Sequence, residues 1–135
     1  MATRALVAVP VVLAVLAGCG GPGNETVKGS MEVDDFQGNC AADFSDISSG
    51  GQAVVTDSSG KVIGTGTLSY DETDSSEQSG LQPGLSVCIY SFQLTVPTGL
   101  PRYGITVSHR GTVWFTSSQM SKGPGLSLSS GGSGL

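Results

Sequence analysis

The stretch from Ser86 to Val96, SVCIYSFQLTV, decides the fold that this sequence predicts. Every second residue in it is apolar or aromatic: Cys88, Tyr90, Phe92, Leu94 and Val96. Successive side chains of a β-strand point to opposite faces of the sheet, so these five side chains share one face. The segment PTGLP at 97–101 ends the run, because proline removes backbone donors and glycine relaxes a turn. The stretch therefore predicts a strand with one row of side chains facing the core.

Shorter segments with strand character lie on both sides of this stretch. They cover Thr26 to Asp34, Gln52 to Thr56, Val62 to Leu68, Tyr103 to His109, Thr112 to Ser117 and Leu126 to Leu128. The residues DSSGK at 57–61 suit a hairpin turn, because Asp and Gly accommodate the backbone that tight turns need. Stretches that favour a helix are nearly absent. The sequence predicts an all-β fold, a small antiparallel β-sandwich of six or seven strands of the immunoglobulin-like kind.

The first nineteen residues have the pattern of an export signal. Arg4 gives a positive start, and the run from Ala5 to Val15 has no charge. A membrane-spanning helix needs about 20 apolar residues, and this run is too short. The residues LAGC at 16–19 resemble the bacterial lipobox, which implies cleavage before Cys19 and a diacylglycerol on its sulfur. An ordinary secretory signal with a chance cysteine is the alternative.

The predicted chain has four parts. Residues 1–18 are the signal peptide, 19–25 a lipidated flexible spacer, 26–128 the β-sandwich domain and 129–135 a disordered glycine-serine tail. Within the domain, the polar and acidic stretch from Asp71 to Gly84 predicts a mobile loop. Two acyl chains on one cysteine suffice for stable anchoring. We therefore expect the domain on the extracytoplasmic face of the cell membrane, held there through Cys19.

The chain contains three cysteines, an odd number for an exported protein. The lipobox accounts for Cys19, which leaves Cys40 and Cys88 as an oxidisable pair. Because export favours oxidation, we predict a disulfide between Cys40 and Cys88. Two free thiols or a metal pair are the alternatives, although no histidine cluster accompanies the cysteines to complete a zinc site.

Two resemblances extend beyond the lipobox. The residues QAVVTDSSGKVI at 52–63, YSFQLTVP at 90–97 and YGITV at 103–107 resemble transthyretin-like and carboxypeptidase-regulatory-like modules. The lipobox together with segments 44–47, 57–66, 88–96 and 103–112 is similar to a group of actinobacterial lipoproteins. The first family consists mostly of accessory or adhesive sandwich modules, and the second has no activity to transfer. Both resemblances therefore imply fold and location, and neither implies a catalytic residue.

Net charge argues against nucleic acid as a partner. The formal net charge is −5, and Arg4 is the only base before Cys19, so the exported part is one unit more negative. A negative net charge disfavours contact with phosphate backbones or anionic lipid head groups through a basic patch.

Few residues suit catalysis or metal binding. His109 is the only histidine, and the positive charge of Arg110 beside it disfavours an imidazolium, so Ser-His-Asp chemistry is not predicted. Four acids leave two interpretations open, a calcium site or a solvated acidic loop: Asp71, Glu72, Asp74 and Glu77. We predict no catalytic residue, no resident metal and no cofactor.

Trp114 is the main candidate for a binding residue. Strand alternation places it with Thr112 and Thr116 on the face opposite Val113 and Phe115. Two interpretations remain, a structural tryptophan covered by a loop and an exposed indole that anchors a ligand. We expect a non-enzymatic binding or cell-envelope interaction module, with an envelope protein or a glycan as ligand. A secreted hydrolase-like enzyme and a purely structural envelope component are the alternatives.

Overall fold

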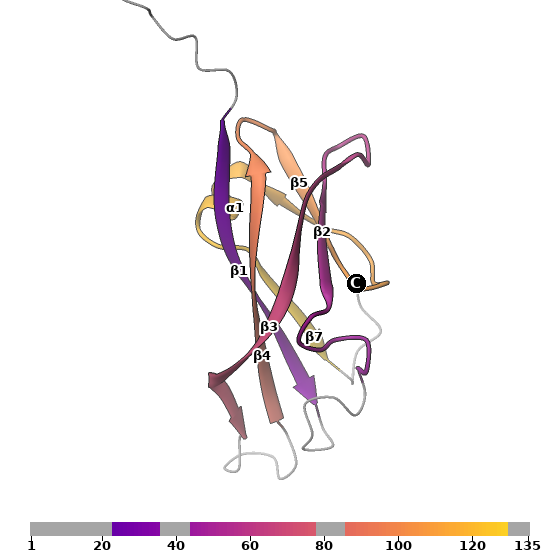
Figure 1. Ribbon diagram of the computed structural model, residues 1–135, viewed down its shortest axis with the longest axis vertical. Helices are drawn as coiled ribbons and strands as arrows, with labels where there is room; N and C mark the ends of the chain where they lie inside the picture. The colour runs from indigo at the N-terminus through magenta and orange to yellow at the C-terminus, as the bar shows by residue number, and fades with distance from the viewer. Residues whose placement is uncertain (1–22, 36–43, 78–85, 130–135) are drawn as a thin grey trace, which may run out of the picture.

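The computed structural model describes residues 23–35, 44–77 and 86–129, which form seven strands and one short helix (Figure 1). The elements are β1 (Asn24–Asp35), β2 (Gln52–Thr56), β3 (Val62–Glu77), β4 (Ser86–Pro97), β5 (Arg102–Val107), β6 (Val113–Thr116), α1 (Ser117–Ser121) and β7 (Gly125–Ser129). The predicted all-β fold is confirmed. In the part of the chain that the structure describes, no helix has the length and apolar character needed to span a membrane.

The strands form one continuous sheet with the order β6-β5-β2-β3-β4-β1-β7. The long strand β3 joins its two halves, because Val62 to Thr67 pair with β2 and Leu68 to Glu77 pair with β4. The architecture thus differs from the expected pair of packed sheets, and β7 runs parallel to β1 where an antiparallel strand was expected. The sheet curls so far that residues of β1, β5 and β7 line one hollow.

The core lies inside this curl and confirms the row that the sequence predicts on β4. Burial alternates along β4, and the side chains of the row are at most 4 % exposed. Gln93, one position beyond Phe92, is exposed. Apolar side chains from the other strands complete the same cluster, among them Val33, Val55 and Ile105. Burial of one face therefore fixes the register of the sheet.

The predicted hairpin between β2 and β3 is confirmed. The Asp57 Oδ1 atom accepts hydrogen bonds from the backbone N–H groups of Ser59 and Lys61 at 2.8 and 3.0 Å. The hydroxyl of Ser59 also donates to Asp57 and, as the main cause, lowers the pKa of this carboxyl. These bonds fix the loop that carries Ser58, which contacts the candidate site described below.

The predicted loop from Asp71 to Gly84 is wrong over its first half. Residues up to Glu77 continue β3, and Ser76 and Glu77 lie opposite Val87 and Ser86 of β4 after a shift in register. The polar composition suggested a loop, but the neighbouring strand supplies backbone partners that do not depend on side-chain character. Residues 78–85 lie outside the described residues.

The short helix α1 is not predicted from the sequence. Its N-cap is Thr116, whose hydroxyl accepts from the Gln119 backbone N–H, while the Gln119 side chain accepts from the Thr116 backbone N–H. This reciprocal capping box satisfies two helix-end donors. Met120 anchors the turn in the core at 1 % exposure. A local cap and one buried side chain thus form a helix that helix propensity does not indicate.

The predicted lipidation site and the predicted disulfide lie partly outside the described residues. Cys19, the signal peptide, most of the spacer and the 130–135 part of the tail are not described. Cys88 is fully buried and disulfide-bonded. Cys40 is not described, so the pairing of Cys40 with Cys88 stays a prediction.

Candidate functional site

Trp114 lies on the outer face of the edge strand β6 and is exposed. Its side chain is 41 % exposed, whereas Phe115 is 8 % exposed and packs against the core. Thr112 and Thr116 are exposed as well. The predicted alternation is confirmed, and of the two interpretations of Trp114 the structure favours an open surface over a covered tryptophan.

The indole rests on a position without a side chain. Gly104 of β5 lies directly opposite Trp114 in the register. A β-carbon at Gly104 would stand 3.0 Å from Cζ3 of the indole and 2.7 Å from Cγ2 of Thr112. Real β-carbons do not tolerate such approaches without a shift, so glycine lets the ring lie close to the sheet.

The row that contains Trp114 continues across four strands. Gly104 pairs with Thr56 of β2, and Thr56 pairs with Val62 of β3. Val62 is 54 % exposed, so this row holds two large exposed hydrophobic side chains with glycine and threonine between them. We call Trp114, Gly104, Thr56 and Val62, together with the adjacent Arg102, the Trp114 platform.

Arg102 supplies the charge of the platform. Its guanidinium carbon lies 4.4 Å from the centroid of the Trp114 ring, in a cation–π contact. Its Nε–H donates to the Ser58 hydroxyl at 3.3 Å, which ties the side chain to the β2–β3 hairpin. Among the described residues, no Asp or Glu forms an ion pair with Arg102. Arg102 is not predicted from the sequence, although the same alternation along β5 places it two residues from Gly104.

The two threonines predicted beside Trp114 have structural partners. The Thr112 and Thr106 hydroxyls share a hydrogen bond of 2.7 Å. The Thr116 hydroxyl accepts the capping hydrogen bond of α1 at 3.2 Å. Trp114 and Arg102 are therefore the better candidates for direct contact with a ligand, and the threonines shape the surface around them.

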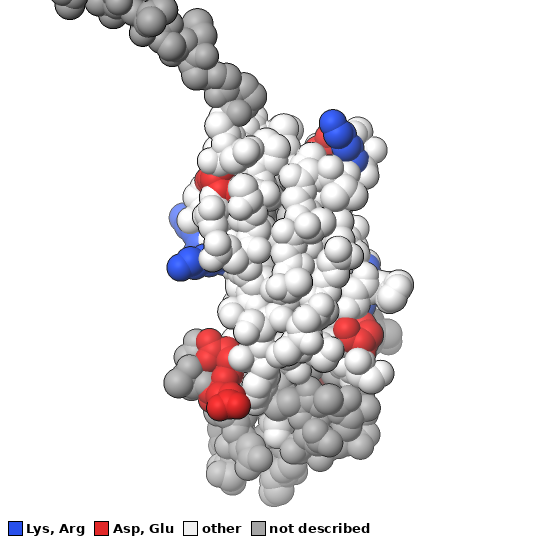
Figure 2. All heavy atoms as spheres, viewed as in Figure 1, with Lys and Arg blue, Asp and Glu red and all other residues white. Residues whose placement is uncertain are grey.

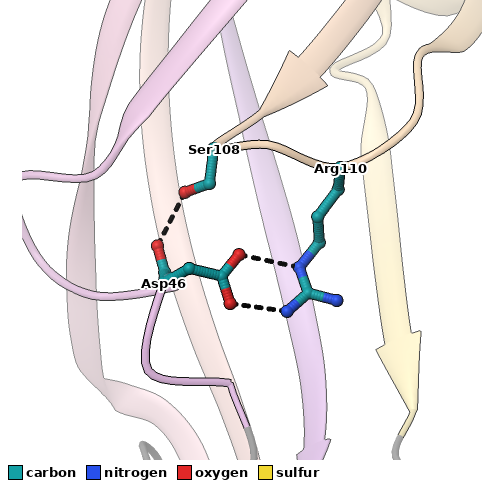
Figure 3. Close-up of polar contacts among 3 residues, drawn as sticks. All are labelled: Asp46, Ser108 and Arg110. Atoms are coloured by element: carbon teal, nitrogen blue, oxygen red, sulfur yellow. Dashed lines mark hydrogen bonds and ion pairs between the residues drawn. The ribbon is translucent and has the colours of Figure 1, made fainter.

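A second polar cluster holds the 44–51 segment against the turn between β5 and β6 (Figure 3). Arg110 donates two hydrogen bonds to the Asp46 carboxylate, from Nε at 2.9 Å and from Nη2 at 2.5 Å. The Ser108 hydroxyl donates to the Asp46 backbone carbonyl at 2.6 Å. The hydrogen bond from Arg110 is the main cause that lowers the pKa of Asp46. Because Asp46 already neutralises Arg110, this cluster is a structural tie.

His109 and the acids at 71 and 72 are described residues that the sequence offered for hydrolase chemistry or calcium binding. His109 lies in the exposed turn after β5, next to an arginine that is bound to Asp46. In residues 23–35, 44–77 and 86–129, no group of three or more His, Cys, Asp or Glu side chains is placed to hold a metal ion. Asp71 and Glu72 belong to β3 and not to a loop.

Two hollows of the described surface lie apart from the Trp114 platform. A hollow of about 20 Å³ lies where β1 and β7 approach β5, lined mainly by apolar side chains such as Met31, Val113 and Leu126. This volume suits about one water molecule. A shallow depression follows Lys28, Thr67 and Gln93 on the outer face of β1, β3 and β4. On the face shown in Figure 2, charged side chains form small separate groups, and uncharged side chains cover the middle.

Comparison with protein families, with curated proteins and with solved structures finds no match to this chain. The resemblances to transthyretin-like modules and to actinobacterial lipoproteins therefore stay predictions.

Proposed function

We propose that this chain is a lipid-anchored extracytoplasmic β-domain that acts as a non-enzymatic binding or cell-envelope interaction module. The observation that carries the proposal is the exposed indole of Trp114, held on the rigid face of β5 and β6. The lipobox at 16–19 supports the location. A tether at Cys19 would keep the platform close to ligands of the envelope.

Tryptophan is a strong binding anchor for physical reasons. The indole offers a large apolar area with few rotatable bonds, so fixing it costs little conformational entropy. Trp114 is the only tryptophan of the chain, and it is 41 % exposed. The stacked guanidinium of Arg102 limits its motion further. The platform is therefore organised before a ligand arrives.

Cross-linking in the native membrane tests this proposal. Full-length protein is cross-linked in its own cells, and the captured envelope material is compared between the natural chain and Trp114→Ala. We expect a recurring captured component that Trp114→Ala reduces at least about fivefold, because removing a central aromatic anchor costs about 1 kcal/mol or more. Tyr70→Ala is the matched control, since Tyr70 is a 37 % exposed aromatic residue on β3, opposite Tyr90 of β4.

The outcomes separate the three functional interpretations. A component lost equally in both variants would contradict a role for Trp114 and favour a structural envelope component. Covalent labelling by a serine-directed probe would favour the hydrolase alternative. Mass spectrometry of the mature protein tests the location, because an N-terminus other than lipidated Cys19 would contradict the anchor.

A further inference from the structure

We propose that the ligand of the Trp114 platform is an anionic polyol, a sugar or polyol chain that carries a carboxylate or a phosphate, with the anionic group on Arg102. This inference rests on the proposed binding function and names its ligand class. Three properties of the platform support it: its extent, its uncompensated cation and its mixture of apolar and hydroxyl groups.

The extent of the platform suits a chain and not one small ring. The row from Trp114 through Gly104 and Thr56 to Val62 crosses β6, β5, β2 and β3. Neighbouring strands lie about 4.8 Å apart, so the row spans about 14 Å. A ligand laid along it contacts an exposed apolar side chain at each end, at Trp114 and at Val62.

The positive charge of Arg102 favours an anionic ligand. Arg102 uses Nε–H on Ser58, and its Nη1 and Nη2 groups have no described acidic partner. The other arginine after β4, Arg110, is neutralised by Asp46. A guanidinium presents paired N–H donors that match a carboxylate or a phosphate. Stacking on Trp114 and the bond to Ser58 hold these donors in place before binding.

The side chains around the charge favour a polyol over a protein surface. Between Trp114 and Val62 the platform offers glycine and threonine, with Thr112 and Thr106 at its border. The centre of a protein interface is usually apolar and well packed, whereas only a glycine and a threonine lie between the two apolar side chains of this surface. The Thr56 hydroxyl donates to the Gly104 carbonyl at 3.5 Å, and its oxygen can still accept a hydrogen bond. Polyols match this mixture, because each unit presents C–H groups and hydroxyls side by side.

Binding measurements on the purified full-length protein test the ligand class. The probes are an oligogalacturonate, an oligomer of glycerol phosphate and a neutral galactose oligomer of matched length. We expect at least one anionic probe to bind about tenfold or more tightly than the neutral one, with an affinity that falls as salt increases. Preference for oligogalacturonate would identify the carboxylate source, and preference for glycerol phosphate the phosphate source.

Substitutions test whether the anionic probes bind at the Trp114 platform. Arg102→Gln should weaken the anionic probe about tenfold or more, and Arg102→Lys should restore only part of the loss, because lysine keeps the charge without the planar donors. Lys122→Gln is the matched control, since it removes one exposed charge beyond α1 and should leave binding unchanged. Thermal midpoints confirm that each variant is folded.

Two results would overturn the inference. One is equal binding of the neutral probe, or no binding of either anionic probe. The other is an equal loss in Arg102→Gln and Lys122→Gln, which would mean diffuse attraction to any cation. If cross-linking still depends on Trp114 while the anionic probes fail, the ligand class is wrong and the binding function stands. If Trp114→Ala leaves cross-linking unchanged, the proposed binding function itself is contradicted.

Discussion

At the scale of single residues, Gly104 controls how the indole of Trp114 is presented. An added methyl group at Gly104 would stand 3.0 Å from the indole and 2.9 Å from the Thr56 hydroxyl oxygen. We predict that Gly104→Ala lifts the ring from the sheet and lowers the free energy of unfolding by about 1–3 kcal/mol, as overpacking does. Urea denaturation measures the loss, and a shift in tryptophan fluorescence reports the displaced ring.

Gly111→Ala is the control for this prediction. No atom lies within 4 Å of a β-carbon built at Gly111, and its φ is not in the left-handed region. The substitution should be neutral or stabilise slightly, because alanine restricts the unfolded chain. Equal effects of both substitutions would mean that the indole does not depend on the space above Gly104.

Single residues also show how far a sequence predicts a site. Alternation alone placed Trp114 outward and Phe115 inward, and the structure agrees. Arg102 was missed because its role depends on the register between β5 and β6, which brings strand positions from separate segments together. Register follows from packing across the whole sheet, so one segment does not encode it.

At the scale of elements, the bond between Asp46 and Arg110 ties the 44–51 segment to the β5–β6 turn. Arg110 lowers the pKa of Asp46, so the ionised form contributes stability above the unfolded value of about 3.9. That contribution is lost as the pH falls through the lower folded-state pKa. Because the Asp46 side chain is 34 % exposed and screened by solvent, Asp46→Asn should cost only about 1 kcal/mol at pH 7.

Urea midpoints of the natural chain and Asp46→Asn at pH 7 and pH 2 check this prediction. The difference in urea midpoint between the two proteins should shrink as the pH falls toward 2, because the natural carboxyl becomes protonated as the pH passes through its lowered pKa. A difference in urea midpoint that does not change with pH would show that the substitution acts through packing. One such contact is that of Arg110 with the Phe44 ring at 4.9 Å.

Elements with a strong hydrophobic period were predictable, and those that depend on neighbours were not. The β2–β3 hairpin and the row on β4 follow from local turn residues and alternation. The end of β3 is polar, and it becomes a strand through its pairing with Ser86 and Val87 of β4. The helix α1 depends on the capping box at Thr116, a signal present in the sequence that strand-rich composition obscured.

At the scale of the whole molecule, we predict that non-reducing peptide mapping finds Cys40 joined to Cys88. Such a bond would close a loop of about 48 residues and stabilise the fold by roughly 4 kcal/mol in the chain-entropy estimate. Reduction should lower the thermal midpoint accordingly. Recovery of both residues as free thiols from cell-surface protein would contradict the pairing.

The overall topology shows the limit of sequence patterns most clearly. The strand count and the all-β class follow from composition and alternation. The pairing of β7 with β1 does not, because the two segments are separated by most of the domain and β7 has only five residues. Long-range partners are chosen by the shape of the assembled core, and a short strand carries too few side chains to indicate them.

The parallel pairing of β7 with β1 also determines when folding finishes. One edge of β1 pairs with β4, and the other edge, from Ser30 to Asp34, pairs with Gly125 to Ser129. The N-terminal strand also leaves the export channel first, so this edge stays unpaired until nearly the whole domain has crossed the membrane. Open strand edges attract other chains, and pairings between distant segments form slowly. The period between the first strand and the last is therefore the time of greatest risk of aggregation, and a chaperone that covers β1 would act in that period.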